Sequence, residues 1–237
     1  MSDNLRLGQP ATQGTSGRYR PGVHRVKRVL ATYVAIAAAV IGLGWLLTHP
    51  MAATVGAFDD DVSRWFADRR TPELDHVAAA ATFVADTWVG ALVALVVAVT
   101  AAALDRSWRG PTLVLAAVGG HLAIYLLATH LDPRDRPPVP ILDPGLVPDH
   151  SFPSGHVGTA VIAYGCLAVV LVLRWRPGAP RSVVLGVLAL VPFLVALSRL
   201  YQGAHHLTDV VTSLVYASSW LLVLARAGAP RSVVLTR

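Results

Sequence analysis

The sequence predicts an all-α integral membrane protein, a bundle of six transmembrane helices with a short interfacial helix after the first span. Three observations lead to this fold class. Hydrophobic residues make up 54% of the 237-residue chain and charged residues only 14%, against a usual charged share of about 25%. The mean hydropathy is positive, at +0.54. The apolar residues are gathered in runs of about 20, the length needed to cross the hydrocarbon core of a bilayer.

Both ends of the chain are predicted to be tails outside the bundle. Residues 1–28 begin with a polar stretch rich in Gly, Ser, Thr and Gln and end in a basic collar. Such a composition is typical of a disordered cytoplasmic tail. It does not indicate a cleavable signal peptide, because no apolar core follows the first residue within the expected distance. Residues 226–237 are predicted to be a second cytoplasmic tail, so residues 29–225 form the predicted six-span domain.

The first span, residues 29–48, is followed by a polar excursion over residues 49–73. Four bulky apolar residues recur in this excursion at helical spacing, and they are Phe58, Val62, Trp65 and Phe66. This pattern predicts an interfacial amphipathic helix.

The next long helix is expected to begin near Pro72, since proline is favoured in a first turn. It is expected to continue without a break to about Leu104, which is longer than one span requires. Its outer turns would then project above the bilayer and place Asp86 near the interface. A buried, functional Asp86 is the alternative.

Four more spans are predicted at residues 111–130, 154–173, 182–198 and 208–224. The loop over residues 131–153 holds seven of the sixteen prolines, so it is stiff and cannot be helical throughout. His121 lies inside a span and is expected to hydrogen-bond a neighbouring helix. Cys166, the only cysteine, is expected to pack within a span. A single cysteine excludes an internal disulfide and a cysteine-based metal site.

Lysine and arginine are distributed unevenly between the two sides of this predicted bundle. With the N-terminus inside, the inner segments hold 14 of the 20 basic residues and the outer segments hold 6. Under the positive-inside rule, this bias predicts that both termini are cytoplasmic. The net charge of +6 does not indicate nucleic acid binding, because the basic residues lie at the ends of apolar runs and not on one helix or strand.

Three polar clusters fall on the predicted outer side, and they are Arg134–Pro137, Pro153–His156 and Ser198–Asp209. Arg136 and Arg199 offer planar, permanently charged donors that suit phosphate oxygens. Ser154, Gly155 and His156 open a span, so that free backbone N–H groups and the positive helix end point outward, ready for an anion. These clusters indicate chemistry on a phosphate.

His205 and Asp209 are four residues apart at the start of the last span, and we expect them on one helical face. That spacing lets the carboxylate hold one ring nitrogen and leaves the other free as a nucleophile. His156 is a second imidazole, able to donate a proton to a leaving oxygen. Because each imidazole has an ordinary pKa near 6.5, the pair predicts a bell-shaped pH profile.

In these residues the chain resembles a membrane member of the type 2 phosphatidic acid phosphatase family, whose site is related to those of vanadium haloperoxidases and glucose-6-phosphatase. The family pattern is Lys, six residues, Arg-Pro; then Pro-Ser-Gly-His; then Ser-Arg, five residues, His, three residues, Asp. The second motif matches at residues 153–156 and the third over residues 198–209. The first motif matches only in Arg136-Pro137, because Thr129 stands at the lysine position with His130 beside it.

The resemblance implies a role for each of these residues. His205 would attack phosphorus to form a phosphohistidine, Asp209 would orient it, and His156 would protonate the departing group. The phosphate-binding residues would be Arg136, Ser154, Gly155 and Arg199. Arg134 is expected to replace the missing lysine, because its charge does not depend on pH, and His130 is the alternative. No cofactor is implied, and the sequence offers no ligand cluster for a metal.

These roles predict a hydrolase, a membrane phosphatase acting on a lipid phosphate or diphosphate from the outer face of a bacterial plasma membrane. Undecaprenyl diphosphate, phosphatidic acid and phosphatidylglycerol phosphate are compatible substrates, in falling order of preference. One alternative is a phosphotransferase that passes the phosphohistidine to a lipid or sugar. Another is a catalytically inactive lipid-binding or transport relative, supported only by the absent lysine. The expected partners are therefore the lipid substrate and the bilayer; small residues in the spans permit a dimer without requiring one.

Overall fold

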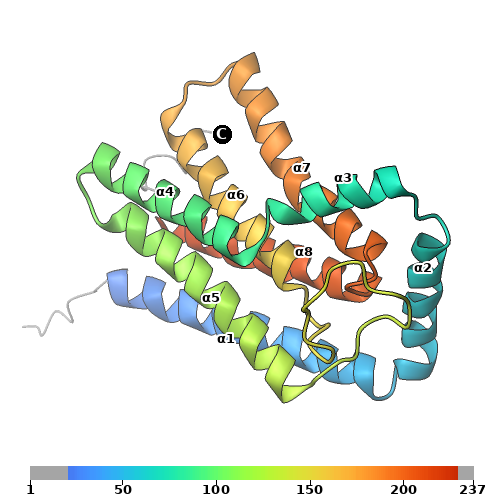
Figure 1. The fold of residues 1–237 in the computed structure, drawn as a ribbon. Helices are drawn as coiled ribbons and strands as arrows, with labels where there is room; N and C mark the ends of the chain where they lie inside the picture. Colours follow the sequence, from blue (N-terminus) through green and yellow to red (C-terminus); the bar gives the residue numbers. More distant parts are fainter. Residues whose placement is uncertain (1–20, 229–237) are drawn as a thin grey trace, which may run out of the picture.

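Six helices of the structure are long and apolar enough to cross a membrane. The computed structural model describes residues 21–228. Within that range the helices are α1 (Pro21–Thr48), the π-helical turn η1 (Ala52–Gly56), α2 (Ala57–Ala67), α3 (Pro72–Phe83), α4 (Thr87–Asp105), α5 (Arg109–Leu131), α6 (Gly155–Arg174), α7 (Ala179–Tyr201) and α8 (Leu207–Gly228) (Figure 1). The six candidate spans are α1 from Val23 onward, α4, α5, α6, α7 and α8. The all-α, six-span prediction is confirmed.

The first span begins earlier than the sequence predicts. Residues 21–28, which we expected to belong to the N-terminal tail, form the first turns of α1. Pro21 opens this helix, where its fixed φ and missing N–H are well tolerated. The remainder of the predicted N-terminal tail and most of the C-terminal one, residues 1–20 and 229–237, lie outside the described residues.

The predicted continuous helix from Pro72 to Leu104 is wrong, because the chain breaks at residues 84–86 into α3 and α4. Asp86 has an extended ψ of 147° and caps α4 by accepting a hydrogen bond from the Thr87 N–H. Tyr164 of α6 donates to the carbonyl of Val84 at 2.7 Å and holds the break in place. As a result α3 leaves the bundle and packs on α7, while α4 alone crosses it (Figure 1).

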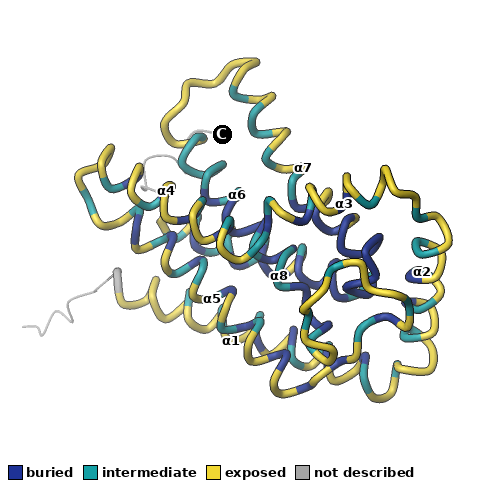
Figure 2. The backbone as a smooth tube through the Cα atoms, in the orientation of Figure 1, coloured by how far each residue is buried: buried dark blue, intermediate teal, exposed yellow. Residues whose placement is uncertain are grey.

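Helix α6 is the centre of the bundle, since it packs against α4, α5, α7 and α8. Buried positions concentrate around it, whereas α1 is exposed along most of its length (Figure 2). Many exposed side chains of the spans are Leu, Val or Phe, as expected for surfaces that face lipid. The predicted packing role of Cys166 in α6 agrees with its buried position.

The short helix after the first span, α2, is amphipathic, but its buried face is the polar one. Phe58 and Trp65 of α2 are 57% and 51% exposed, while Asp59 and Ser63 are buried at 0% and 1%. The polar face of α2 therefore points inward, against the end of the bundle formed by α7 and α8. A buried carboxylate is costly unless it is paired, and Asp59 has its partners at that end.

The proline-rich loop between α5 and α6 folds back on itself. Its two limbs are joined by backbone hydrogen bonds, with Arg134 N–H donating to the Asp149 carbonyl and Ser151 N–H to the Arg134 carbonyl. Leu142 N–H donates to the carbonyl of Gln202 and ties the loop to the end of α7. The loop thus lies over one end of the bundle, beside the start of α8 (Figure 1).

Candidate active site

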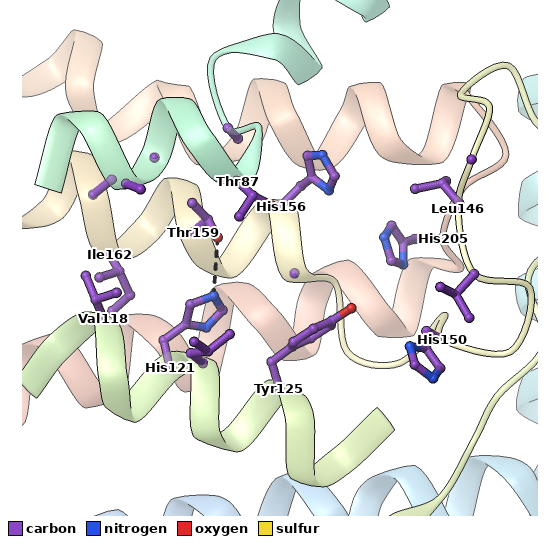
Figure 3. A pocket seen from close by; sticks show the side chains of 18 of the residues that line it. Thr87, Val118, His121, Tyr125, Leu146, His150, His156, Thr159, Ile162 and His205 are labelled. Carbon is purple, nitrogen blue, oxygen red and sulfur yellow. Dashed lines mark hydrogen bonds between the residues drawn. The ribbon is translucent and has the colours of Figure 1, made fainter. Parts of the chain in front are cut away.

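A cavity of about 400 Å³ lies where the proline-rich loop meets the starts of α4 and α6, the middle of α5 and the α7–α8 turn. His156, His205 and Tyr125 line it (Figure 3). Arg136 is a further lining residue. The residues at the other end of the cavity include Val118, Leu122, Ile162 and Ala163. The cavity therefore has a polar end that carries the two histidines and an apolar end between the spans.

The polar end borders a set of buried donors that have no partner within the described residues. They are Ser154 Oγ and the Nε and Nη2 atoms of Arg199, and both residues are 0% exposed. Ser154 is the N-cap of α6 and its side chain makes no capping hydrogen bond. The first N–H groups of α6 and the positive helix end lie directly after it. Buried donors grouped at the start of a helix are of the kind that suits an anion.

The third nitrogen of the Arg199 guanidinium, Nη1, is hydrogen-bonded to side chains of the protein. It donates to Asp143 Oδ2 at 2.6 Å and to Gln202 Oε1 at 3.0 Å. These two contacts fix the plane of the guanidinium, so that its other edge is free for an anion. Asp143 belongs to the proline-rich loop and was not singled out by the sequence.

Arg136 lines the cavity, but its guanidinium is occupied by backbone carbonyls. It donates to Val147, Ala204 and His150 carbonyls at 2.9, 2.5 and 3.2 Å. Burial, and secondly the charge of Arg199, lower the pKa of Arg136. The side chain therefore clamps the loop to the turn that carries His205, and it contributes charge to the polar end of the cavity.

His205 lies in the turn between α7 and α8 and is only 3% exposed. Gly203 makes this turn possible, because its φ of +69° is one that residues with a Cβ rarely adopt. The Nδ1 atom of His205 lies 2.7 Å from the carbonyl oxygen of Ser151. A carbonyl can only accept, so in the neutral ring the proton resides on Nδ1 and Nε2 keeps its lone pair.

The environment of His205 also favours the neutral ring. Burial lowers its pKa to about 4, the charges of Arg199 and Arg136 act in the same direction, and the nearby carboxylate of Asp209 opposes them. A neutral ring with a free Nε2 is the form that a nucleophilic imidazole needs.

The expectation that His205 and Asp209 share one helical face is wrong, since α8 begins only at Leu207. Asp209 Oδ2 is 3.8 Å from His205 Nδ1. It accepts hydrogen bonds from Ser151 Oγ at 2.6 Å and from the His206 backbone N–H at 2.8 Å. The second contact is a capping arrangement, in which a residue of the first helical turn reaches back to the N-cap N–H. Asp209 thus holds Ser151, whose carbonyl binds His205, and His206, which follows His205 in the chain.

Arg134 does not occupy the position that was predicted for a replacement of the lysine. Its Nη1 donates to Asp209 Oδ1 at 2.5 Å and its Nη2 to Asp59 Oδ2 at 2.8 Å. Burial lowers the pKa of Arg134, but Asp209 and Asp59 outweigh this effect and raise it above the ordinary value. With both donors bound by carboxylates, its place is behind Asp209 and not on the cavity wall.

The lysine position itself is closed to the site. Thr129 is 1% exposed and its hydroxyl donates to the backbone carbonyl of Tyr125, one turn earlier in α5. His130, the alternative replacement, is exposed and its Nδ1 contacts the carbonyl of Leu126. The permanently charged side chain on the cavity wall is therefore Arg136.

His156 occupies the opposite wall of the cavity (Figure 3). Its Nε2 is 3.8 Å from Asp86 Oδ1, the residue at the α3–α4 break. Asp86 is 43% exposed on its side chain, so it is not the buried residue of the alternative prediction. The α3–α4 break is what brings this carboxylate to His156.

His121 is a hydrogen-bonded core residue, as the sequence indicates. Its Nδ1 lies 2.8 Å from Tyr216 Oη. Its Nε2 lies 3.4 Å from Thr159 Oγ1 (Figure 3). Gly158 allows α6 to approach, because a Cβ there would overlap the His121 ring. Within residues 21–228 no group of three or more His, Cys, Asp or Glu side chains is arranged to hold a metal ion.

A family model described as the PAP2 superfamily matches residues 110–231. The chain belongs to this superfamily. The match covers α5 to α8 and thus contains all three motifs, in agreement with the resemblance found in the sequence.

The PAP2 fold is also found in a solved structure. It is described as the first transmembrane PAP2 type phosphatidylglycerolphosphate phosphatase from Bacillus subtilis. The two chains superpose with a TM-score of 0.65 at 21% identity, over 85% of this chain and 94% of the other. No curated protein matches the chain. Family and fold together support a multi-pass membrane phosphatase.

Proposed function

We propose that this PAP2 protein hydrolyses a lipid phosphate or diphosphate through a phosphohistidine on His205. The observation that carries the proposal is the set of unpartnered buried donors, Ser154 Oγ and Arg199 Nε and Nη2, beside a cavity lined by two histidines. Buried polar groups are normally paired, so donors without a partner next to a cavity are suited to a ligand anion. The apolar end of the same cavity suits the chain of a lipid.

The first half-reaction uses the neutral form of His205 and requires a proton on His156. Nε2 of neutral His205 attacks phosphorus, the N–P bond forms, and the P–O bond to the leaving group breaks. His156 donates a proton to the departing oxygen. Charge that develops on the phosphoryl oxygens is stabilised by Ser154, Arg199 and the N–H groups at the start of α6, including that of Gly155.

The second half-reaction reverses these roles with water as the attacking group. His156, now neutral, takes a proton from water as the oxygen attacks phosphorus. The P–N bond breaks, inorganic phosphate leaves, and His205 returns to the neutral Nδ1–H form that the Ser151 carbonyl favours. Each histidine ends in the state in which it began, which a turnover cycle requires.

The substrate panel contains undecaprenyl diphosphate, phosphatidic acid and phosphatidylglycerol phosphate. The last gains support from the shared fold with the Bacillus subtilis phosphatidylglycerolphosphate phosphatase. Purified protein in detergent should release phosphate from at least one of them and give an acid-labile phosphoenzyme with a radiolabelled substrate. His76→Ala, which removes an exposed histidine of α3, is the matched control for substitutions of the site histidines. Absence of both phosphate release and phosphoenzyme would contradict the proposal.

We further propose that the site faces the outside of a bacterial plasma membrane with both termini in the cytoplasm, as the 14-to-6 division of basic residues indicates. In a Cys166→Ala background, Leu142→Cys on the proline-rich loop should react with an impermeant thiol reagent in intact cells. Trp108→Cys, at an 82% exposed position of the α4–α5 turn, should react only after lysis. The reverse pattern would place the site in the cytoplasm.

A further inference from the structure

A buried charge cluster connects α2 to the catalytic end of α8. Its members are Asp59 of α2, Arg134 of the proline-rich loop and Asp209 of α8, which are 0%, 7% and 0% exposed. Arg134 lies between the two carboxylates and donates one Nη to each, at 2.8 Å to Asp59 and 2.5 Å to Asp209. Asp59 is separated by about 75 residues from Arg134 and by twice that from α8.

Asp59 is also anchored to the start of α8 directly. Its Oδ2 accepts from the hydroxyl of Thr208 at 2.5 Å and its Oδ1 from the Thr208 backbone N–H at 3.2 Å. That hydroxyl accepts in turn from Arg134 Nη1 at 2.7 Å. Asp59 therefore has a fixed position one residue from Asp209, although it touches neither histidine of the site.

The charge of the cluster acts on His205. Two carboxylates and one guanidinium leave one net negative charge, on the Nδ1 side of the ring. His205 faces positive charge from Arg136 and Arg199, and it lies opposite His156 across the cavity. Attack through Nε2 turns the neutral ring into a cationic phosphoimidazolium, so the negative charge behind Nδ1 stabilises the product of that step. Without Asp59, the guanidinium of Arg134 would neutralise Asp209.

We propose that Asp59 is a positioning residue for the reaction: by pairing with Arg134, it preserves the negative charge with which Asp209 supports His205. This inference rests on the proposed role of His205 as nucleophile. It also gives the buried polar face of α2 a function, because the helix carries a charge to the site that the catalytic motifs themselves do not contain.

The kinetic test uses Asp59→Asn, Arg134→Gln and the double variant, in detergent, with the lipid that the wild type hydrolyses. Asp59→Asn should lower kcat about tenfold and leave KM within about twofold, because Asp59 does not contact the phosphate. The double variant removes both charges, leaves Asp209 negative, and should recover kcat to within about threefold of the wild type. A purely structural Asp59 would give a double variant no faster than Asp59→Asn.

The matched control is Asp61→Asn, which removes a carboxylate from the same helix at a side chain that is 75% exposed and paired with Arg64 on the surface. It should leave kcat unchanged. Equal kcat values for wild type and Asp59→Asn, or a double variant without recovery, would overturn the inference.

A second measurement is independent of activity. The pKa of His205 is determined by NMR on protein labelled at histidine Cε1, with the signal assigned from His205→Gln. Asp59→Asn should lower it and Arg134→Gln should raise it, each by roughly one pH unit, and the double variant should restore it. If the wild type releases no phosphate, the proposed function fails, while this titration still decides the inference. Should Asp59→Asn not fold, the opposite shift in Arg134→Gln and its reversal in the double variant remain decisive, and unchanged values contradict it.

Discussion

The two histidines of the cavity are held in different ways. His205 is 3% exposed, its Nδ1 is bound to a buried carbonyl, and Asp209, Arg134 and Asp59 stand behind it. His156 has an 18% exposed side chain and faces Asp86 at 3.8 Å, a carboxylate that is itself 43% exposed. The difference matches the proposed tasks. A nucleophile must keep one tautomer, whereas a group that gives and takes protons must communicate with substrate and water.

The strongest test of this comparison removes each ring in turn. His205→Ala should abolish the phosphoenzyme and lower kcat by a factor on the order of 1,000 or more, because it removes the ring proposed to form the N–P bond. His156→Ala should slow a lipid substrate by about 100- to 10,000-fold. It should spare more of the reaction with p-nitrophenyl phosphate, whose leaving group needs no proton. Phosphoenzyme in His205→Ala, or equal losses on both substrates in His156→Ala, would refute the division of roles.

Arg199→Lys tests the anion site between the two rings. A lysine keeps the charge but loses the planar edge with Nε and Nη2, so we expect a loss of about ten- to a hundredfold in kcat/KM. Arg64→Lys, at an exposed arginine that pairs with Asp61, is the matched control and should behave as the wild type. An Arg199→Lys enzyme of normal kcat/KM would show that the planar edge with Nε and Nη2 does not bind the substrate.

The pH dependence distinguishes the buried ring from an ordinary one. Protonation of His205 removes its lone pair, so kcat/KM must fall as the pH falls through its pKa. With the pKa lowered to about 4 by burial, activity at pH 5.5 should lie within about twofold of the plateau set by this group. An imidazole with an ordinary pKa near 6.5 would instead lose about tenfold at that pH. A stopped assay from pH 4 to 8 decides between them, and an acid limb near 6.5 would contradict the effect of burial.

Asp86→Asn should have the smallest effect. Because its carboxylate is 3.8 Å from His156 and partly exposed, the pair is worth little, and we expect a two- to threefold loss, roughly, on lipid substrates. Asp68→Asn, at an exposed acid at the end of α2, is the control. A loss as large as that of His156→Ala would mean that His156 depends on Asp86 as strongly as His205 depends on its buried partners.

The sequence predicted the spans and the motif residues because each is a local pattern. Apolar runs reveal a span, and Ser154, Gly155 and His156 are adjacent in the chain. Residues whose role depends on distant partners were not predictable in this way. Asp59 stands in a run of three acids that reads as a solvent-exposed face, and only the fold shows that it is buried against Arg134.

Two errors of the sequence-based prediction have the same cause. The helix from Pro72 was extended through Asp86 because the residues around the break are as apolar as those of a span, and nothing local marks Tyr164 as the partner of the Val84 carbonyl. Arg134 is predicted to bind phosphate because the sequence shows its charge but not the two carboxylates that pair with it. In both cases a tertiary contact overrides a sound local interpretation.

The cluster of Asp59, Arg134 and Asp209 has a consequence for biogenesis. Asp59 is synthesised 149 residues before the Thr208 that binds it, and Arg134 is synthesised 75 residues before Asp209. The opposite charges of Asp59 and Arg134 are thus synthesised first, and the second carboxylate, Asp209, is synthesised only with the last helix. A nascent chain that stops before α8 holds an Asp59–Arg134 pair without its second carboxylate, while one that includes α8 closes the network. The charge cluster behind His205 therefore cannot be complete until α8 has been added to the bundle.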